Sequence, residues 1–184
     1  MSTDKWKEYY KKVNTKPRVL LVEALQYANK TGSALDLGCG ASGDTYHLQE
    51  LGYTVTSVDS SDKVLEYIPS AIISSFEEFP FPKNEYSIVN AQFALSFCNP
   101  NRIDDVFESI KKSLQAGGIF TGQFFGPNDS WAIRSDMNFK TREQMQNLLG
   151  DLEIIKFEEE EKDTPTALGD PHHWHLFHII ARKI

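Results

Sequence analysis

The stretch ALDLGCGASGD, residues 34–44, decides the predicted fold, because a short apolar strand runs directly into a glycine-rich turn. Gly38, Gly40 and Gly43 have the spacing G-x-G-x-x-G, which is typical of turns that bring bare backbone close to a nucleotide. Asp36 stands two residues before the first of these glycines. The ligand of such a turn must therefore tolerate a carboxylate beside it.

Segments with strand and helix patterns alternate along the chain. The expected strands cover residues 34–37, 53–58, 71–74, 86–91, 119–125, 152–160 and 174–182, and the expected helices cover 3–12, 17–29, 43–51, 62–67 and 103–114, with one more after a capping box at Thr141 and Gln144. This alternation indicates an α/β fold with a mainly parallel sheet and helices on both faces. The last two strands have no helix between them, so they form an antiparallel hairpin. We expect seven strands with one antiparallel to the rest.

Composition narrows the class of protein. A length of 184 residues with 40% hydrophobic residues predicts a single globular domain over 1–184. The formal net charge of −7 repels phosphate backbones, so no nucleic-acid partner is expected. Cys39 and Cys98 are too few for a disulfide framework. The N-terminus is polar, and no apolar run reaches the ~20 residues that span a bilayer. We therefore expect a cytoplasmic protein without a membrane partner.

Two classes of ligand fit the glycine turn. A nicotinamide or flavin dinucleotide would place its pyrophosphate at the helix N-terminus after the turn. S-adenosylmethionine instead brings a cationic sulfonium and an ammonium. The carboxylate of Asp36 repels a pyrophosphate and attracts these cations, which favours S-adenosylmethionine. Asp59, at the end of the second strand, suits the ribose hydroxyls of either ligand.

Five motifs in order extend this interpretation, namely ALDLGCGASGD, VTSVDSS, SSFEEFPF, EYSIVNAQFALSFC and LQAGGIFTGQFFG. Together with the ending HWHLFHIIARKI, the set resembles class I S-adenosylmethionine-dependent methyltransferases, and most closely their compact branch that includes tellurite-resistance-type enzymes. The resemblance implies a Rossmann-like sheet and methyl transfer to a small-molecule acceptor. It also implies S-adenosylmethionine as cofactor and S-adenosylhomocysteine as product.

The resemblance also assigns residues to parts of the cofactor. Asp36, Gly38 and Gly40 would cradle the methionine part, with Cys39 in the same turn. Asp59 would take the ribose hydroxyls.

The remaining assignments follow the later strands. Ser60 would flank Asp59 at the ribose, and Phe76 and Glu77 would approach the adenine. Ala91 and Gln92 would border the methionine part and the acceptor.

The N-terminal segment 1–30 contains two predicted helices that could close over the cofactor as a lid. Nothing else near the turn is cationic, so we expect Arg18 or Tyr10 to reach the methionine carboxylate.

Methyl transfer from a sulfonium mainly requires that donor and acceptor are held in line, and a base is needed only when the acceptor arrives protonated. The candidate bases are His175 and His173, which lie with His172 at the start of the last strand. Their spacing within one strand does not suit a tetrahedral metal site, so no metal is expected.

Two alternatives stay open. The first is a nicotinamide-dependent oxidoreductase that uses the same turn, which Asp36 and the short chain disfavour. The second is a non-catalytic module that binds S-adenosylmethionine, because cofactor motifs and acceptor chemistry are separable. The identity of the methyl acceptor and the oligomeric state are not encoded in any recognisable motif.

Overall fold

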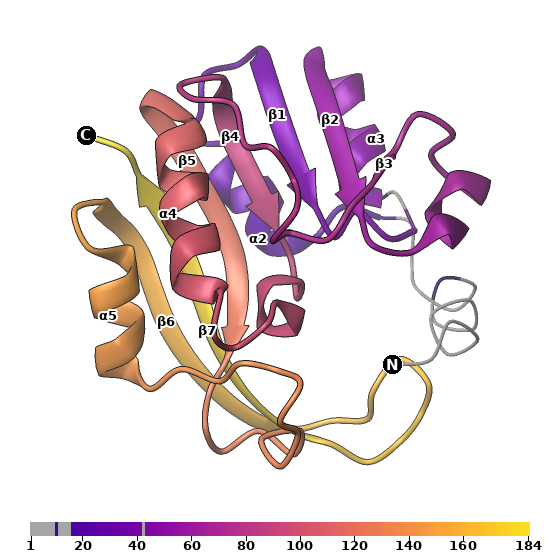
Figure 1. Cartoon of the computed structure of the whole chain (residues 1–184), viewed down its shortest axis with the longest axis vertical. Helices are drawn as coiled ribbons and strands as arrows, with labels where there is room; N and C mark the ends of the chain where they lie inside the picture. The colour runs from indigo at the N-terminus through magenta and orange to yellow at the C-terminus, as the bar shows by residue number, and fades with distance from the viewer. Residues whose placement is uncertain (1–9, 11–15, 42) are drawn as a thin grey trace.

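The computed structural model describes residues 10, 16–41 and 43–184, and its centre is a seven-stranded sheet (Figure 1). The strands are β1 (Gly32–Leu37), β2 (Tyr53–Asp59), β3 (Ile72–Ile73), β4 (Tyr86–Ala91), β5 (Leu114–Phe125), β6 (Glu153–Asp163) and β7 (His173–Arg182). Their order is β3-β2-β1-β4-β5-β7-β6. The first five strands are parallel, and β7 runs antiparallel to both of its neighbours. The predicted fold class is confirmed.

Helices cover both faces of the sheet (Figure 1). The α-helices among the described residues are α2 (Val19–Ala24), α3 (Gly43–Glu50), α4 (Ile103–Ser113) and α5 (Arg142–Leu149), and two short 3-10 helices are η1 (Asp62–Glu66) and η2 (Leu95–Phe97). On one face, α4 and α5 pack on a core that contains Phe107, Phe120 and Met145. On the other face, Leu21 of α2 and Leu48 of α3 pack on a second apolar cluster.

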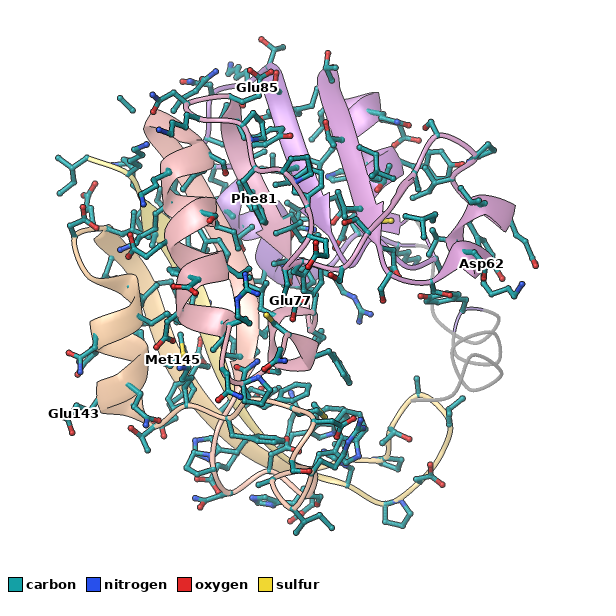
Figure 2. The ribbon with its side chains drawn as sticks, in the orientation of Figure 1. Asp62, Glu77, Phe81, Glu85, Glu143 and Met145 are labelled. Carbon is teal, nitrogen blue, oxygen red and sulfur yellow. The ribbon has the colours of Figure 1, made fainter. Side chains whose placement is uncertain are left out.

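The patterning of α4 and α5 explains these contacts. Val106, Phe107 and Ile110 recur at helical spacing and are buried against the sheet. In α5, Met145 is buried, whereas Glu143 of the same helix points away into solvent (Figure 2). The predicted capping box that begins α5 is confirmed, since Thr141 and Gln144 each accept a hydrogen bond from the other's backbone N–H.

The structure shifts several predicted boundaries. The helix expected over 17–29 ends at Ala24, and the strand expected over 71–74 has only two residues. Strand β5 begins at Leu114, earlier than predicted, because Gly117 and Gly118 exchange backbone hydrogen bonds with Lys183 and so extend the ladder. The helix expected over 3–12 lies outside the described residues except for Tyr10.

This topology brings the carboxyl ends of β1, β2 and β4 to one edge. Strand β1 pairs in parallel with both neighbours, so Asp36 lies beside Ser57 on one side and Asn90 on the other. In open α/β sheets this edge is where ligands bind. Among the described residues, no helix is long and apolar enough to cross a membrane.

Candidate functional site

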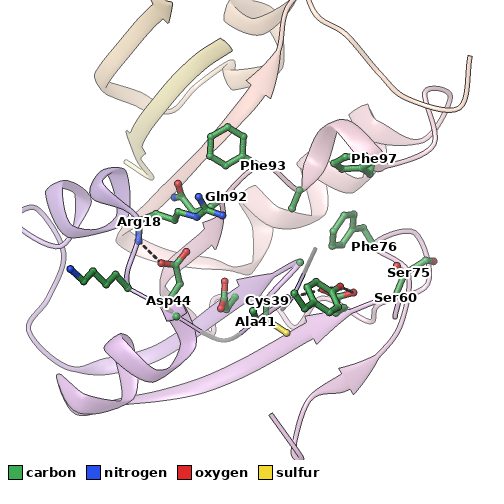
Figure 3. A pocket seen from close by; sticks show the side chains of 18 of the residues that line it. Arg18, Cys39, Ala41, Asp44, Ser60, Ser75, Phe76, Gln92, Phe93 and Phe97 are labelled. Atoms are coloured by element: carbon green, nitrogen blue, oxygen red, sulfur yellow. Dashed lines mark hydrogen bonds between the residues drawn. The ribbon is translucent and has the colours of Figure 1, made fainter. Parts of the chain in front are cut away.

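A cavity of about 160 Å³ opens beyond the carboxyl ends of β1, β2 and β4 (Figure 3). It is lined by residues from the glycine turn, the ends of β2 and β4 and the segment before α2, namely Tyr10, Lys16, Arg18, Asp36, Gly38, Cys39, Gly40, Ala41, Gly43, Asp44, Asp59, Ser60, Ser75, Phe76, Glu77, Gln92, Phe93, Ala94 and Phe97. Every residue predicted to bind the cofactor lines this cavity except Ala91. The side chain of Ala91 is fully buried in the core, and its backbone pairs with Gly122.

The turn after β1 needs glycine for both backbone and space. Gly38 and Gly40 have φ angles of 71° and 48°, which L side chains rarely adopt. A Cβ on Gly38 would lie 2.6 Å from the Cβ of Ala94, and one on Gly40 would lie 3.2 Å from the Tyr10 ring. The N–H of Gly38 donates to the carbonyl of Val58 at 2.8 Å, which pins the turn to β2. The turn is therefore closely packed, is fixed to β2 by a hydrogen bond, and carries no side chain at Gly38 or Gly40.

Asp36 is buried beneath this turn. Its carboxylate accepts hydrogen bonds from Thr45 Oγ1 at 2.6 Å and from Asn90 Nδ2 at 2.8 Å. Burial, and next the charge of Asp44, raise the pKa of Asp36 to about 7 although both hydrogen bonds oppose this rise. A cation in the cavity would lower the pKa of Asp36 again, because it favours the carboxylate form.

Asp44 supplies a second carboxylate that sequence reasoning missed. It lies in the first turn of α3, where it accepts hydrogen bonds from the backbone N–H of Arg18 at 2.7 Å and from Asn90 Nδ2 at 3.1 Å (Figure 3). Burial raises its pKa as well. Asn90 thus bridges Asp36 and Asp44 and is itself fully buried. The signal that could have found Asn90 is a polar residue near the end of an otherwise apolar central strand.

Asp59 is another buried carboxylate at this edge. It accepts hydrogen bonds from the N–H groups of Gly40 at 3.1 Å and Ser61 at 2.9 Å. The hydroxyl of Tyr10 also donates to Asp59, at 3.4 Å. Burial raises the pKa of Asp59. The structure thus places the Tyr10 hydroxyl at the predicted ribose carboxylate, away from the Asp36–Asp44 pair.

Gln92 carries an unsatisfied polar atom at the cavity. Its Nε2 donates to Asn90 Oδ1 at 2.7 Å, whereas its Oε1 is buried with no hydrogen-bond partner among the described residues. A buried acceptor without a donor costs roughly 1–3 kcal/mol, so this oxygen is ready to receive a donor from a ligand.

Phe76 and Glu77 form the wall on the side of β3. The Phe76 ring lies next to Gly38, 3.6 Å from where a Cβ would stand. Glu77 Oε1 accepts hydrogen bonds from the Asn99 N–H at 2.6 Å and from Cys98 Sγ at 3.1 Å. Burial raises the pKa of Glu77, but these donors outweigh it and the net shift is downward. Its carboxylate therefore holds the turn after η2.

Arg18 is the N-cap residue of α2, and it lines the cavity. Its guanidinium carbon is 5.3 Å from the centroid of the Phe93 ring. This cation–π contact orients Arg18 over the end of β4.

The histidines expected to act as base do not face this cavity, which corrects that part of the prediction. His175 is buried on the other face of β7, where Nε2 lies 2.9 Å from Glu159 Oε1 and Nδ1 accepts from the Asn128 N–H at 3.2 Å. His173 lies between Asp163 at 2.9 Å and Glu161 at 3.0 Å, and these two carboxylates raise its pKa. Both imidazoles are held by acidic side chains of the hairpin.

The thiols are not placed as nucleophiles. Burial raises the pKa of Cys39 and of Cys98, so both stay protonated at neutral pH. Within the part of the chain that the structure describes, no group of three histidine, cysteine or acidic side chains is arranged to hold a metal ion.

Residues 35–121 match the family model described as a methyltransferase domain. The matched segment runs from β1 into β5. An uncharacterized methyltransferase of Synechocystis sp. is 32% identical over 92 residues, which are 47% of this chain and 43% of that relative. The chain thus aligns with less than half of the curated relative it matches.

Solved structures of methyltransferases have the same fold as this chain. TehB from Haemophilus influenzae has a TM-score of 0.77 at 18% identity, over 89% of this chain and 61% of that one. The 1,6-didemethyltoxoflavin-N1-methyltransferase of Burkholderia thailandensis, solved with S-adenosylhomocysteine, has a TM-score of 0.66 at 18% identity, over 90% and 77%. An S-adenosylmethionine-dependent methyltransferase of Methanosarcina mazei has a TM-score of 0.70 at 18% identity, over 91% and 99%. The expected class I methyltransferase fold is confirmed.

Proposed function

We propose that this chain transfers a methyl group from S-adenosylmethionine to a small-molecule acceptor. The observation that carries the proposal is the convergence of three carboxylates, the buried Asp36 and Asp59 and the partly buried Asp44, on one glycine turn. Such a site attracts a cationic nucleoside and repels a diphosphate. The methyltransferase domain and its structural relatives support the same conclusion.

The residues of the cavity fit this cofactor at both ends. Asp36 and Asp44 favour the positive charge of the methionine part, and the Oε1 of Gln92 offers an acceptor to its ammonium. Asp59 would hold the ribose hydroxyls, beside Ser60.

The adenine end would lie along the wall formed by Phe76 and Glu77. Glu77 already accepts two hydrogen bonds from the turn after η2, so Phe76 would supply the main contact to the ring.

The bound cofactor would supply an electrophilic methyl group on a positively charged sulfur. The task of the protein is then to fix its position, because the reaction is an in-line displacement that disperses charge. The glycine turn restricts the methionine part from one side, and Phe93 and Phe97 border it toward the acceptor. Rigid placement by these groups is the source of rate enhancement that we assign to this chain.

A small-molecule acceptor in the cytoplasm fits the charge of the protein. The net charge of −7 disfavours nucleic acid as substrate. The structure of the relative from Burkholderia thailandensis contains 1,6-didemethyltoxoflavin together with S-adenosylhomocysteine.

Titration calorimetry tests the cofactor assignment. We expect S-adenosylmethionine and S-adenosylhomocysteine to bind and NAD⁺ to give no heat above dilution. Transfer of a radiolabelled methyl group into a fractionated cell lysate then tests the reaction and gives the size of the product. Binding of NAD⁺ in preference to S-adenosylmethionine would refute the proposal. Tight cofactor binding without transfer to any fraction would instead support a non-catalytic binding module.

A further inference from the structure

A second and larger cavity of about 540 Å³ adjoins the first. It lies between η2, the loop after β5, and the hairpin turn that leads into β7. Arg18, Phe93 and Phe97 line both cavities, so these three residues form a shared wall. This volume is in the range of pockets that bind small organic ligands.

The walls of the second cavity are aromatic. Phe93 lies 6.3 Å from Trp174, Phe97 lies 6.1 Å from Trp131, and the two tryptophans are 5.6 Å apart, measured between ring centroids. Phe125 lies behind them and contacts Trp131 and Trp174. These rings meet edge to face or tilted, at interplanar angles of 59–71°, and such an aromatic lining favours a flat, aromatic ligand over a saturated one of the same size.

Of the charged residues that line the cavity, Arg134 and Lys162 are neutralised from outside it, and Arg18 and Asp170 carry opposite charges. Arg134 donates two hydrogen bonds to Asp136, at 3.0 and 2.7 Å, and Lys162 donates to Glu160 at 2.7 Å. Neither acid lines the cavity, so neither would be displaced by a ligand. The cavity therefore does not select strongly for an anion.

One buried polar side chain faces this aromatic space. His172 lines the cavity with its Nε2 2.9 Å from Asp129 Oδ1, and both side chains are almost completely buried. Asp129 is fixed in turn, because it accepts from the N–H groups of Trp131 at 2.9 Å and His175 at 3.2 Å. Trp131 and Trp174 pack on the imidazole, with ring centroids 4.6 and 4.1 Å away.

The Asp129 carboxylate fixes the proton of His172 on Nε2, since a carboxylate can only accept. The other ring nitrogen, Nδ1, then carries a lone pair and has no hydrogen-bond partner among the described residues. The cavity thus offers flat apolar walls and one fixed hydrogen-bond acceptor.

We propose that this cavity is the acceptor site, and that it takes an uncharged, flat aromatic compound whose O–H or N–H donates to Nδ1 of His172. The inference rests on the proposed function, because it places the acceptor across the shared wall from the cofactor. It assigns His172 to acceptor recognition and Asp129 to positioning of the imidazole.

Three probe compounds separate the features of the proposed ligand. 2-Naphthol has two flat rings and an O–H, 2-methoxynaphthalene lacks the donor, and decahydro-2-naphthol lacks the flat rings. We expect 2-naphthol to bind roughly tenfold tighter than 2-methoxynaphthalene, since one hydrogen bond in a buried site is worth about 1.4 kcal/mol. We expect a preference of roughly tenfold over decahydro-2-naphthol as well, because that compound lacks the flat rings. Ligand-observed NMR gives the dissociation constants, and quenching of Trp131 and Trp174 fluorescence reports the place of binding.

The variant His172→Phe keeps an aromatic ring but removes the acceptor, so 2-naphthol and 2-methoxynaphthalene should then bind equally. His172→Leu also removes the acceptor and is the second variant if the first unfolds. His178→Gln is the matched control, since His178 lies on β7, which begins directly after His172, and lines neither cavity.

Calorimetry with S-adenosylhomocysteine on the same samples separates the two proposals. Intact cofactor binding without the tenfold preference for 2-naphthol would overturn the acceptor site and leave the proposed function standing. A preference that survives in both His172 variants would overturn the role of His172. If the wild type does not bind S-adenosylhomocysteine, the proposed function is refuted instead.

Discussion

Asp36 is the side chain whose protonation should control cofactor binding. Its pKa of about 7 means that part of the population is protonated at neutral pH. A bound cation favours the carboxylate, so binding lowers this pKa and releases a proton. We therefore expect affinity for S-adenosylmethionine to rise between pH 6 and pH 8. Calorimetry in phosphate and in Tris at pH 7 would detect the released proton as a difference in apparent binding enthalpy.

The variant Asp36→Asn is expected to remove most of that difference and to weaken binding at least tenfold at pH 8. The amine of the cofactor titrates equally with both proteins, so the comparison isolates Asp36. Asp151→Asn is the matched control, because Asp151 lies at the end of α5 and bonds to Lys111. An unchanged proton release in Asp36→Asn would contradict this assignment.

The same carboxylate should lower the stability of the cofactor-free protein. The folded pKa of Asp36 is raised above the value of 3.8 for an exposed aspartate, so the native state binds more protons between about pH 4 and pH 7. Stability then falls as pH rises through this window. Relative to wild type, Asp36→Asn should gain on the order of 2 kcal/mol between pH 5 and pH 7. Urea unfolding at both pH values measures the difference in unfolding free energy between Asp36→Asn and wild type. A difference that does not increase from pH 5 to pH 7 would argue against a raised pKa of Asp36.

At the scale of elements, the glycine turn should be sensitive to added volume as well as to backbone strain. Gly38 and Gly117 both have positive φ, so an alanine at either costs about 1–2 kcal/mol. A Cβ at Gly38 also collides with Ala94, whereas one at Gly117 meets nothing within 4 Å. We expect Gly38→Ala to abolish cofactor binding and Gly117→Ala to keep it. Equal loss of affinity in the two variants would mean that strain alone governs the turn.

Elements with regular patterns were predictable from sequence, and β4 over 86–91 has the predicted bounds. The gathering of the predicted cofactor residues around one cavity was predictable because parallel strand ends meet at one edge. The bridge from Asn90 to Asp36 and Asp44 was not, because it depends on strand neighbours that sequence does not order. The expectation that His175 and His173 face the cavity failed for a related reason. Alternation along β7 separates His175 from Trp174, but periodicity does not say which face meets the cavity.

At the scale of the whole molecule, one aromatic core joins the helices to the sheet. Phe107 of α4 is fully buried, 5.0 Å from Phe120 and 5.9 Å from Phe124 between ring centroids. We expect Phe107→Ala to cost about 3–5 kcal/mol of unfolding free energy, since it leaves a cavity in this core. Val19→Ala should cost little, because Val19 is 83% exposed. Denaturant unfolding compares the two, and a loss below 1 kcal/mol for Phe107→Ala would refute this view of the core.

The wall shared by the two cavities has a thermodynamic consequence. Phe93 has a φ of 54°, a strained value for a bulky residue, and its N–H donates to Gln123 at 3.3 Å. Phe93 therefore has few alternative positions. A ligand that contacts its ring in one cavity should change the affinity of the other cavity for its own ligand. By linkage, the factor by which S-adenosylhomocysteine changes the affinity for an aromatic compound equals the factor by which that compound changes the affinity for S-adenosylhomocysteine. In the proposed reaction, a shift of Phe93 that both ligands feel would couple release of the spent cofactor to departure of the methylated product.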